Sequence, residues 1–320
     1  MADVDVVVGI DLGGTKILTV AATPDGRILA RKRVATPQGR DAVVAAMRDT
    51  VAAVLGEVGA AVPRAIGVGA PGPMDPVAGI LLEPPNLPGC ANLPLAAIFR
   101  QLYPDAGIHV ENDANAAALG ERRFGAGRGV DDLCYVTIST GIGGGIVAAG
   151  RLVRGAAGTG GEVGHTVLAP DGPECHCGLH GCWEVLSSGT AIARAAEAAV
   201  ARGEGAAIRA AAGSGPVDAR AVDQAAAAGD PAALRIVAAA VRYNGIGFCN
   251  LIQVLSPARI IVGGGVSRAW DRYIAPAAAW AKRHAFARPG GMCAIVPADL
   301  GDDVGALGAV AVGLGDAEAS

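Results

Sequence analysis

A strand, a glycine-rich turn and a second strand follow one another at two separate places in this chain. The first copy reads DVVVGIDLGGTKILTVAAT, close to the start, and the second reads DLCYVTISTGIGGGIVAAG, beginning near Asp131. Recurrence on this scale indicates a repeated architecture rather than one continuous core. A chain of 320 residues also exceeds the usual size of a single core. We therefore expect two α/β halves with ligands bound in a cleft between them.

The residues around these two copies predict alternating strands and helices. In the first half we expect strands at 4–10, 17–22, 28–34, 65–69 and 108–111, and helices at 41–61 and 95–102. In the second half we expect Ala-rich helices at 185–202 and 231–256 and strands at 259–262 and 294–296. A last apolar helix at 304–314 has no strand after it. We expect it to pack back onto the first domain.

Composition excludes several classes of partner. Apolar residues make up 52% and charged residues 18% of the chain, which indicates a globular protein. A net charge of −4 gives no basic footprint for nucleic acid or an anionic membrane. The first strand begins too early for a signal peptide, so we expect a cytoplasmic protein. The charge-free stretch 133–150 contains a glycine cluster and is better explained as a strand pair than as a membrane span.

DLGGTK, residues 11–16, follows an apolar strand directly. Gly13, Gly14 and Thr15 can present backbone N–H groups and a hydroxyl to a phosphate, with Lys16 beside them. Asp11 is suited to hold Mg²⁺, which prefers oxygen ligands. The alternative is a plain β-hairpin turn.

Two further glycine clusters strengthen the nucleotide hypothesis. STGIGGG offers Thr140 and Gly141 at the equivalent turn of the second half, and Gly264 and Gly265 follow the strand RIIV. Each cluster alone is a weak signal. Three of them at strand ends, in two similar halves, favour an ATP site.

ENDANAAALGE places Asn112 and Asp113 between an apolar strand and an Ala-rich helix. A carboxylate there could take a proton from a hydroxyl that attacks a phosphate. Asp113 could instead be the N-cap of the helix.

Cysteines crowd into the segment CHCGLHGCWE. Cys175, Cys177 and Cys182, with the upstream histidine of GGEVGH, offer the four ligands of a closed tetrahedral zinc site. His176 and His180 are competing candidates for the fourth ligand. A cluster of merely buried or reactive thiols is the alternative explanation. Cys90, Cys134, Cys249 and Cys293 lie mostly among apolar residues and are expected in the core.

Taken together, the chain resembles the ROK family of sugar kinases and sugar-responsive repressors. The motifs that carry the resemblance occur in family order along nearly the whole chain: DLGGTK, GAPGP, PPNLPG, ENDANAAALGE, STGIGGG, GGEVGH, CxCGxxGCxE and IIVGGG. The resemblance implies an actin-like ATPase (ribonuclease H-like) fold of two lobes with a cleft between them. It implies a smaller lobe at 1–116, onto which a helix at 303–320 packs, and a larger lobe with the zinc loop at 117–302.

The resemblance also implies residue roles. Asp113 would be the general base. The sugar would be bound by the remaining matched residues Gly72, Asn86, Asn112, Glu162, His165 and Glu184. A structural zinc ion would be held by His165, Cys175, Cys177 and Cys182, with one imidazole nitrogen on zinc and the other facing the sugar.

The implied reaction is Mg²⁺-dependent transfer of the γ-phosphoryl group of ATP to the 6-hydroxyl of glucose, by a homodimer or homotetramer. Kinases of mannose, fructose or N-acetylmannosamine are the near alternatives, as is a polyphosphate-using glucokinase. A sugar-sensing repressor is disfavoured, because only a few residues precede the first strand and leave no room for a DNA-binding helix-turn-helix.

Overall fold

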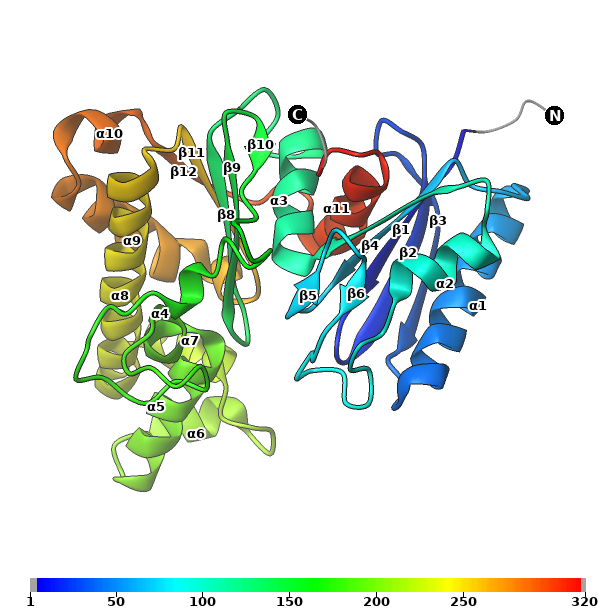
Figure 1. Ribbon diagram of the computed structural model, residues 1–320. Helices are drawn as coiled ribbons and strands as arrows, with labels where there is room; N and C mark the ends of the chain where they lie inside the picture. Colours follow the sequence, from blue (N-terminus) through cyan, green and yellow to red (C-terminus); the bar gives the residue numbers. More distant parts are fainter. Residues whose placement is uncertain (1–4, 318–320) are drawn as a thin grey trace. The chain divides into compact units, whose positions relative to one another are not determined.

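The computed structural model describes residues 5–317. Two five-stranded sheets and a two-stranded ribbon account for the strands (Figure 1). The strands are β1 (Val7–Leu12), β2 (Lys16–Ala22), β3 (Ile28–Ala35), β4 (Ala65–Ala70), β5 (Met74–Asp75), β6 (Ile80–Leu81), β7 (Gly107–Asn112), β8 (Leu133–Ile138), β9 (Ile142–Ala148), β10 (Arg151–Leu152), β11 (Arg259–Gly263) and β12 (Ala294–Pro297).

Helices connect and cover these strands. They are α1 (Arg40–Val58), α2 (Leu95–Leu102), α3 (Asp113–Phe124), α4 (Trp183–Ser187), α5 (Gly189–Ala201), α6 (Ala206–Ala212), α7 (Ala219–Ala227), α8 (Pro231–Leu255), α9 (Trp270–His284), α10 (Ala287–Met292) and α11 (Val304–Gly313). Short 3-10 turns lie at Val163–His165, Val266–Ala269 and Gly301–Asp303. Among the residues described, no helix is both long and apolar enough to cross a membrane.

The two large sheets share one strand order. The first runs β3-β2-β1-β4-β7 and the second β10-β9-β8-β11-β12, so each has its own first strand at the centre. In the first sheet β1 pairs antiparallel with β2 and parallel with β4. In the second, β8 and β12 both pair parallel with β11. The repeated architecture expected from the sequence is therefore present, and the fold is the two-lobed actin-like one.

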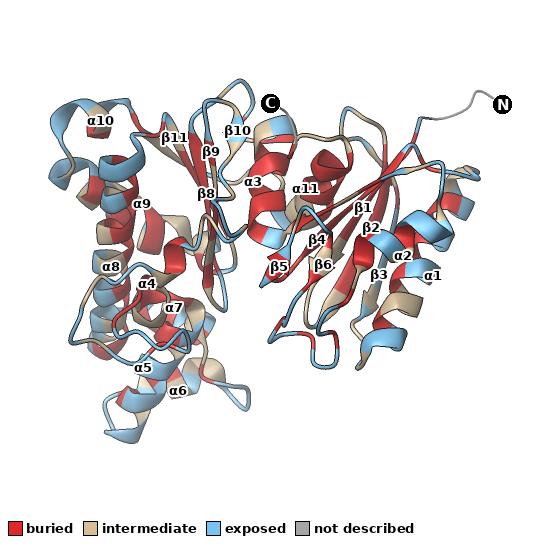
Figure 2. Cartoon of the chain, in the orientation of Figure 1, coloured by how far each residue is buried: buried red, intermediate tan, exposed pale blue. Residues whose placement is uncertain are grey.

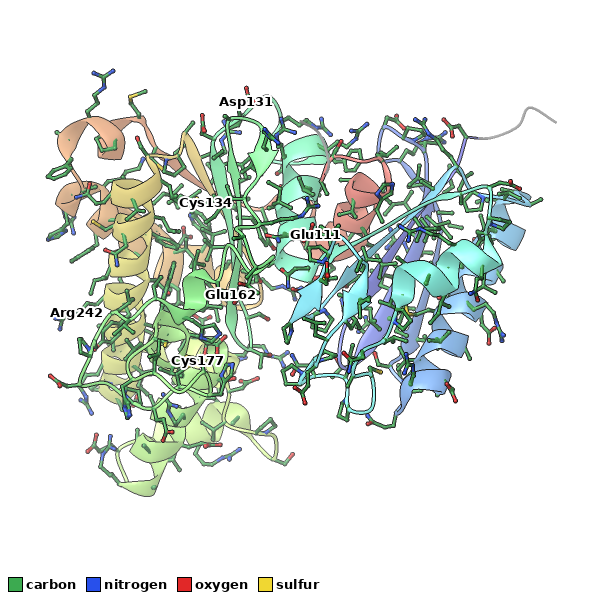
Figure 3. The ribbon with its side chains drawn as sticks, viewed as in Figure 1. Glu111, Asp131, Cys134, Glu162, Cys177 and Arg242 are labelled. Atoms are coloured by element: carbon green, nitrogen blue, oxygen red, sulfur yellow. The ribbon has the colours of Figure 1, made fainter. Side chains whose placement is uncertain are left out.

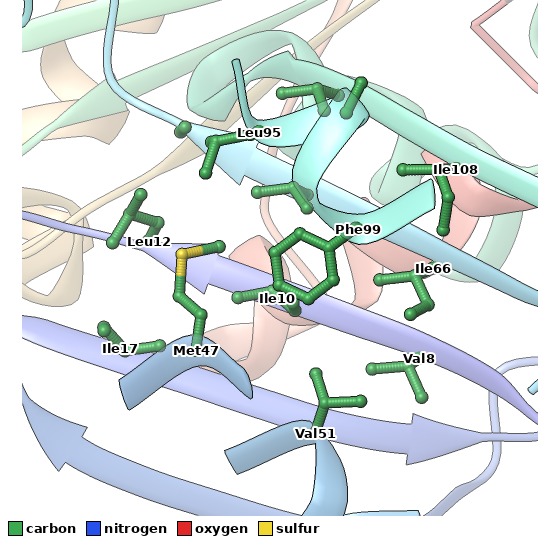
Figure 4. Packing of buried hydrophobic residues seen from close by; sticks show 14 of the residues in the cluster. Val8, Ile10, Leu12, Ile17, Met47, Val51, Ile66, Leu95, Phe99 and Ile108 are labelled. Carbon is green, nitrogen blue, oxygen red and sulfur yellow. The ribbon is translucent and has the colours of Figure 1, made fainter. Parts of the chain in front are cut away.

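Alternation along β1 divides the first sheet into two faces. Val8, Ile10 and Leu12 join the apolar core on one face, where Met47 of α1 and Phe99 of α2 pack among them (Figure 4). These five side chains are all fully buried. Figure 2 shows the same pattern, with buried strands under helices whose outer sides are exposed.

The opposite face of this sheet is covered by α11 at unusually short range. A Cβ on Gly9 of β1 would lie 2.2 Å from the Ala306 carbonyl oxygen, and one on Gly67 of β4 would lie 1.8 Å from that of Ala309. Gly308 makes the same kind of approach to α3, since a Cβ there would lie 2.3 Å from the Ala116 oxygen. Glycine is required where backbones come this close, so these positions seat α11 between the sheet and α3.

A buried carboxylate secures the chain just before α11. Glu121, at the end of α3, is 0% exposed, and it accepts hydrogen bonds from the backbone N–H groups of Ala126, Asp299 and Leu300. These donors satisfy a charge that would otherwise be costly to bury. Glu121 thereby ties residues 299–300 to α3.

The second half has an aromatic centre. Trp183 of α4 packs edge to face on Phe248 of α8, with ring centroids 5.6 Å apart, and its indole N–H donates to Asn244 Oδ1 at 2.9 Å. The single helix predicted at 185–202 is instead two helices, α4 and α5. Ser188 separates α4 from α5 and caps α5 by accepting from the Ala191 N–H at 3.2 Å. The helices α6, α7, α9 and α10 had no counterpart in the sequence-based prediction.

The chain divides into two compact units. The first unit comprises residues 1–131, 145–161 and 298–320, and the second comprises 132–144 and 162–297. This division differs from the expected boundaries of 1–116 and 117–302. The whole of α3 belongs to the first unit, because it packs on α11. The expected strand start at Val4 and the last residues of the expected helix at 303–320 lie outside the described range.

Candidate functional site

The DLGGTK turn joins the antiparallel strands β1 and β2 and is a β-hairpin turn. Gly13 N–H donates to the Lys16 carbonyl at 2.9 Å. Thr36, just after β3, holds the turn from outside, because its hydroxyl donates to the Gly13 carbonyl at 2.6 Å and its N–H to the Thr15 carbonyl at 3.1 Å. Thr15 is exposed at the tip of this hairpin. The hairpin conformation is therefore compatible with phosphate binding by the turn.

Asp11 lies on the α11 face of β1. Its carboxylate packs against Gly305 in the first turn of α11, where a Cβ would lie 2.6 Å from Asp11 Cγ. Burial raises the pKa of this carboxyl group, an effect that Lys16, with Nζ 3.7 Å from Oδ2, only partly opposes. A bound cation would favour the ionised form. The hard oxygen donor at this position fits Mg²⁺.

Two contacts connect other expected residues of the first unit in pairs. Gly14 lies against Asn86, because a Cβ on Gly14 would be 2.6 Å from the Asn86 carbonyl oxygen. Gly72 lies beside Asn112, since a Cβ there would be 3.7 Å from Asn112 Nδ2. The PPNLPG loop thus touches the DLGGTK turn, and the GAPGP loop touches the ENDAN motif.

The start of α3 is capped by Asn112 and not by Asp113. Asn112 Oδ1 accepts from the N–H groups of Ala114, at 2.9 Å, and Asn115, at 3.2 Å. The alternative in which Asp113 is the N-cap is therefore wrong, because α3 begins at Asp113 itself, one residue earlier than that role requires. Asp113 is exposed in the first turn, and its Oδ1 accepts from the Ala114 N–H at 2.8 Å.

Sequence reasoning missed the residue behind this corner. Glu111 is 0% exposed and accepts from the Asn112 N–H and from Asn115 Nδ2, both at 3.0 Å. Its other oxygen accepts from Arg154 Nε at 2.8 Å (Glu111 is labelled in Figure 3). The signal available was an acidic residue at the end of an apolar strand, but nothing in the sequence pairs position 111 with position 154.

In the second unit, Glu184 contacts the STGIGGG turn. Its Oε2 accepts from the Ile142 N–H at 2.9 Å, and a Cβ on Gly141 would lie 2.2 Å from the same oxygen. Thr140, next to Gly141, is exposed and receives the Thr190 N–H on its carbonyl oxygen at 3.3 Å. The predicted sugar ligand Glu184 and the predicted ATP turn are therefore neighbours.

The third glycine cluster lies against the same turn. A Cβ on Gly264, whose φ is +91°, would lie 2.4 Å from the Ile138 carbonyl oxygen, and one on Gly265 would lie 3.8 Å from Ser139 Oγ. The Ser267 hydroxyl donates to the Gly264 carbonyl at 2.8 Å. Two of the three predicted ATP-binding clusters thus come together within the second unit.

The cysteine cluster has the geometry of a tetrahedral site. The ligand atoms of His165, Cys175, Cys177 and Cys182 all lie within 4.8 Å of one another. Cys177 Sγ lies 3.6 Å from Cys182 Sγ, and Cys175 Sγ lies 3.6 Å from His165 Nδ1. A zinc–sulfur bond of about 2.3 Å implies sulfur atoms about 3.8 Å apart in a tetrahedron. The four residues therefore fit Zn²⁺.

The competing histidines take other positions. His180 Nδ1 lies 3.1 Å from the Gly172 carbonyl oxygen. His176 Nδ1 lies 3.9 Å from Cys175 Sγ and 3.5 Å from Glu184 Oε1, and the group His165, His176 and Glu184 is also compact. The four-residue set contains His165 rather than either competitor.

Burial raises the pKa of the Cys182 thiol to about 12 and also raises that of Cys175, whereas the Leu179 N–H lowers that of Cys177. Metal binding to such thiols would release protons. The other cysteines behave as core residues: Cys90, Cys134 and Cys293 are buried, although Cys249 is only partly so.

The expected sugar-binding residues fall in both units. Gly72, Asn86, Asn112 and Asp113 belong to the first, and Glu162, His165 and Glu184 to the second. Glu162 is exposed, and its carbonyl oxygen accepts from the His165 N–H at 3.1 Å at the start of the short 3-10 turn (Glu162 is labelled in Figure 3).

Known sugar kinases are similar to this chain, two of them over nearly its full length. A glucokinase of Thermotoga maritima is 35% identical over 310 residues, which cover 95% of this chain and 96% of that protein. A solved ROK family glucokinase of Streptomyces griseus, in complex with glucose and AMPPNP, is 36% identical with a TM-score of 0.81, covering 97% of this chain and 99% of that one. An N-acetylmannosamine kinase of Escherichia coli is 34% identical over 212 residues, 64% of this chain and 69% of that protein.

The ROK family model itself matches residues 7–315, a span that includes the hairpin turn at Gly13, the Asn112 cap, the thiol cluster and α11. The chain belongs to the ROK family.

Proposed function

We propose that this protein is a glucokinase, which transfers the γ-phosphoryl group of ATP to the 6-hydroxyl of glucose. The observation that carries the proposal is the exposed Asp113 carboxylate in the first turn of α3, in a motif whose capping role is filled by Asn112. The likeness to glucokinases of two bacteria, at 35% and 36% identity over nearly the whole chain, supports glucose as the substrate.

In the proposed reaction Asp113 accepts the proton of the attacking hydroxyl group. The remaining hydroxyls of the sugar are bound by the amides of Asn86 and Asn112, the carboxylates of Glu162 and Glu184, and the His165 imidazole. Phosphoryl transfer needs little covalent chemistry from the protein, so orientation of the hydroxyl and stabilisation of charge account for most of the acceleration.

The glycine turns bind the nucleotide in this proposal. Backbone N–H groups and hydroxyls at Gly13, Gly14, Thr15, Thr140 and Gly141 would face the phosphates, with Lys16, Gly264 and Gly265 completing the set. Asp11 would hold Mg²⁺, which when bound supplies neutralisation of phosphate charge. Its carboxylate is already seated at the N-terminal turn of α11.

We assign a structural zinc ion to His165, Cys175, Cys177 and Cys182. Four protein ligands close the coordination sphere, so the ion has no position for a reacting water. Its role would be to join GGEVGH to the segment that ends in Glu184, which places the metal behind the sugar ligands rather than in the reaction. We also expect a homodimer or homotetramer, as the family resemblance implies, which light scattering would test.

A second candidate substrate is N-acetylmannosamine, favoured by the 34% identity to the kinase from Escherichia coli over 64% of this chain. A coupled assay with glucose, mannose, fructose and N-acetylmannosamine, each with ATP or polyphosphate, separates the possibilities. We expect the highest kcat/KM for glucose with ATP. A far higher value for another sugar would reassign the substrate and keep the kinase, and no turnover with any pair would refute the proposed function.

A further inference from the structure

We propose that the ion pair between buried Glu111 and partly buried Arg154 is a positioning device, which fixes the sugar-binding corner at Asn112 and Asp113 relative to the loop that leads into Glu162. Neither residue belongs to the set that binds sugar or nucleotide. The inference rests on the proposed function, because the corner is assigned there to the reacting hydroxyl group.

Both carboxylate oxygens of Glu111 accept hydrogen bonds, one from the corner at Asn112 and the other from Arg154. Oε1 accepts from the Asn112 backbone and from the Asn115 side chain at 3.0 Å each. Oε2 accepts from Arg154 Nε at 2.8 Å. The Asn112 side chain is simultaneously engaged as the cap of α3. The residue directly before Asp113 is thus held through both its backbone and its side chain, which leaves the direction of α3 little freedom.

Arg154 contacts both Glu111 and the loop that leads into Glu162. Its side chain is 25% exposed and ends on Glu111, whereas its own carbonyl oxygen accepts from the Gly160 N–H at 2.7 Å. A Cβ on Gly160 would lie 2.7 Å from the Arg154 carbonyl carbon, so the loop closes tightly on Arg154 at a position that requires glycine. Two residues later the chain reaches Glu162. Arg154 therefore contacts the carboxylate behind the corner with its side chain and the Gly160 N–H, at the start of GGEVGH, with its backbone.

Stability alone does not explain such a pair. A buried ion pair loses most of its Coulomb attraction to desolvation and is often no better than apolar residues of equal size. A nearby pair gives the contrast: Arg122 is 27% exposed, much like Arg154, but its partner Asp131 is 71% exposed and lies 3.2 Å away. Of these two pairs, the one at Glu111 joins a fully buried carboxylate to the sugar-binding corner.

The test compares Glu111→Gln, Arg154→Met, Arg154→Lys and the double variant Glu111→Gln/Arg154→Met with Arg122→Met as the matched control. Glutamine keeps the shape but turns an N–H group toward Arg154, and lysine keeps the charge but loses the Nε–H. We expect kcat/KM for the sugar to fall by about 10- to 100-fold in Arg154→Met, as small misplacements of reacting groups do, and the KM for ATP to change by less than about twofold.

We expect Arg154→Lys to lose less than Arg154→Met, the double variant to lose about as much as the worse single one, and Arg122→Met to stay at wild-type values. Thermal unfolding of each variant is measured in parallel. Loss of stability with unchanged kinetic constants for sugar would assign the pair a structural role only and overturn the inference.

Amide hydrogen exchange provides a readout that does not depend on turnover. In Glu111→Gln we expect faster exchange in both 112–115 and 155–162, and in Arg122→Met in neither segment. If exchange in the two segments is unchanged in Glu111→Gln, the pair does not position them and the inference fails, whatever the enzyme does. If the wild type phosphorylates no sugar but exchange rises in both segments, the proposed function fails and the positioning device remains.

Discussion

The corner at Asn112 and the thiol cluster at Cys177 are organised in opposite ways. At the corner, buried Glu111 accepts from Asn112, Asn115 and Arg154, so protein groups alone hold the geometry. In the thiol cluster the candidate ligand atoms lie against one another, with Cys177 Sγ 3.6 Å from Cys182 Sγ and Cys175 Sγ 3.6 Å from His165 Nδ1 (Cys177 is labelled in Figure 3). The first region is prepared by the chain itself, and the second is arranged so that an ion can complete it.

The largest expected effect is on kcat, for a substitution at the corner of Asn112 and Asp113. Asp113→Asn keeps the hydrogen bond to the Ala114 N–H but cannot accept a proton from a hydroxyl group. We expect kcat to fall by about 10²- to 10⁴-fold, with sugar affinity and thermal stability nearly unchanged. Steady-state kinetics and calorimetric sugar titration provide the measurements.

Asp41→Asn is the control for this change, because Asp41 is an exposed acid in the first turn of α1 in the same unit. It removes the same favourable charge from a helix start, and it should leave kcat as it is. A near-wild-type kcat in Asp113→Asn would show that Asp113 is only a favourable charge at the start of α3. The proposed general-base role at the corner would then be wrong.

The next effect should come from the thiol cluster, the proposed zinc site. Cys177→Ser removes one of the four ligands, so we expect zinc affinity to fall by at least about 10- to 100-fold, together with thermal stability and glucose affinity. ATP affinity should change less, because the glycine turns do not contain the ligands. Elemental analysis, thermal unfolding and glucose titration measure the three losses.

Cys249→Ser is the matched control, since Cys249 is a partly buried cysteine on α8 outside the cluster. It should retain about one zinc per chain, the stoichiometry expected of a single closed site. Active protein without zinc, or unchanged glucose affinity in Cys177→Ser, would contradict the idea that this region depends on an ion.

The smallest effect should come from Gly305→Ala. This variant tests whether Asp11 only packs within the protein, as Glu111 does, or also holds an ion, as proposed for the thiol cluster. A Cβ at Gly305 would lie 2.6 Å from Asp11 Cγ, so the carboxylate or the start of α11 has to move. We expect a destabilisation of about 1–3 kcal/mol and a KM for ATP raised by roughly tenfold.

Gly56→Ala in α1 is the opposite case, because a Cβ there meets nothing within 4 Å. It should stabilise the protein by about 0.5–1 kcal/mol. If Gly305→Ala changed stability but not ATP affinity, Asp11 would be a packing residue of the first sheet.

Local patterns predicted much of what these experiments address. The apolar run at 4–10 predicts a strand, and a cluster of three cysteines predicts a metal site from spacing alone. Both interpretations depend on residues close together in sequence. The structure agrees with the first in the core of the first sheet and gives the second a compact set of ligands.

Contacts between distant residues could not be predicted in this way. Glu111 and Arg154 are 43 positions apart, and Glu121 and Leu300 are 179 apart, so no periodicity relates them. Only Asp113 was considered as a helix cap, and the sequence could not correct this, because Asn and Asp are equally good caps and a difference of one residue in where α3 begins decides between them.

The seating of α11 has a consequence for how the chain folds during synthesis. Gly9 and Gly67 lie on a sheet face that the helix at Val304–Gly313 covers, and the second unit, 132–144 with 162–297, is made before that helix. During synthesis this side of β1 and β4 should therefore stay uncovered until α11 has emerged from the ribosome. Domains usually fold in order from the N-terminus. In this chain the first unit to begin folding should be the last to complete it.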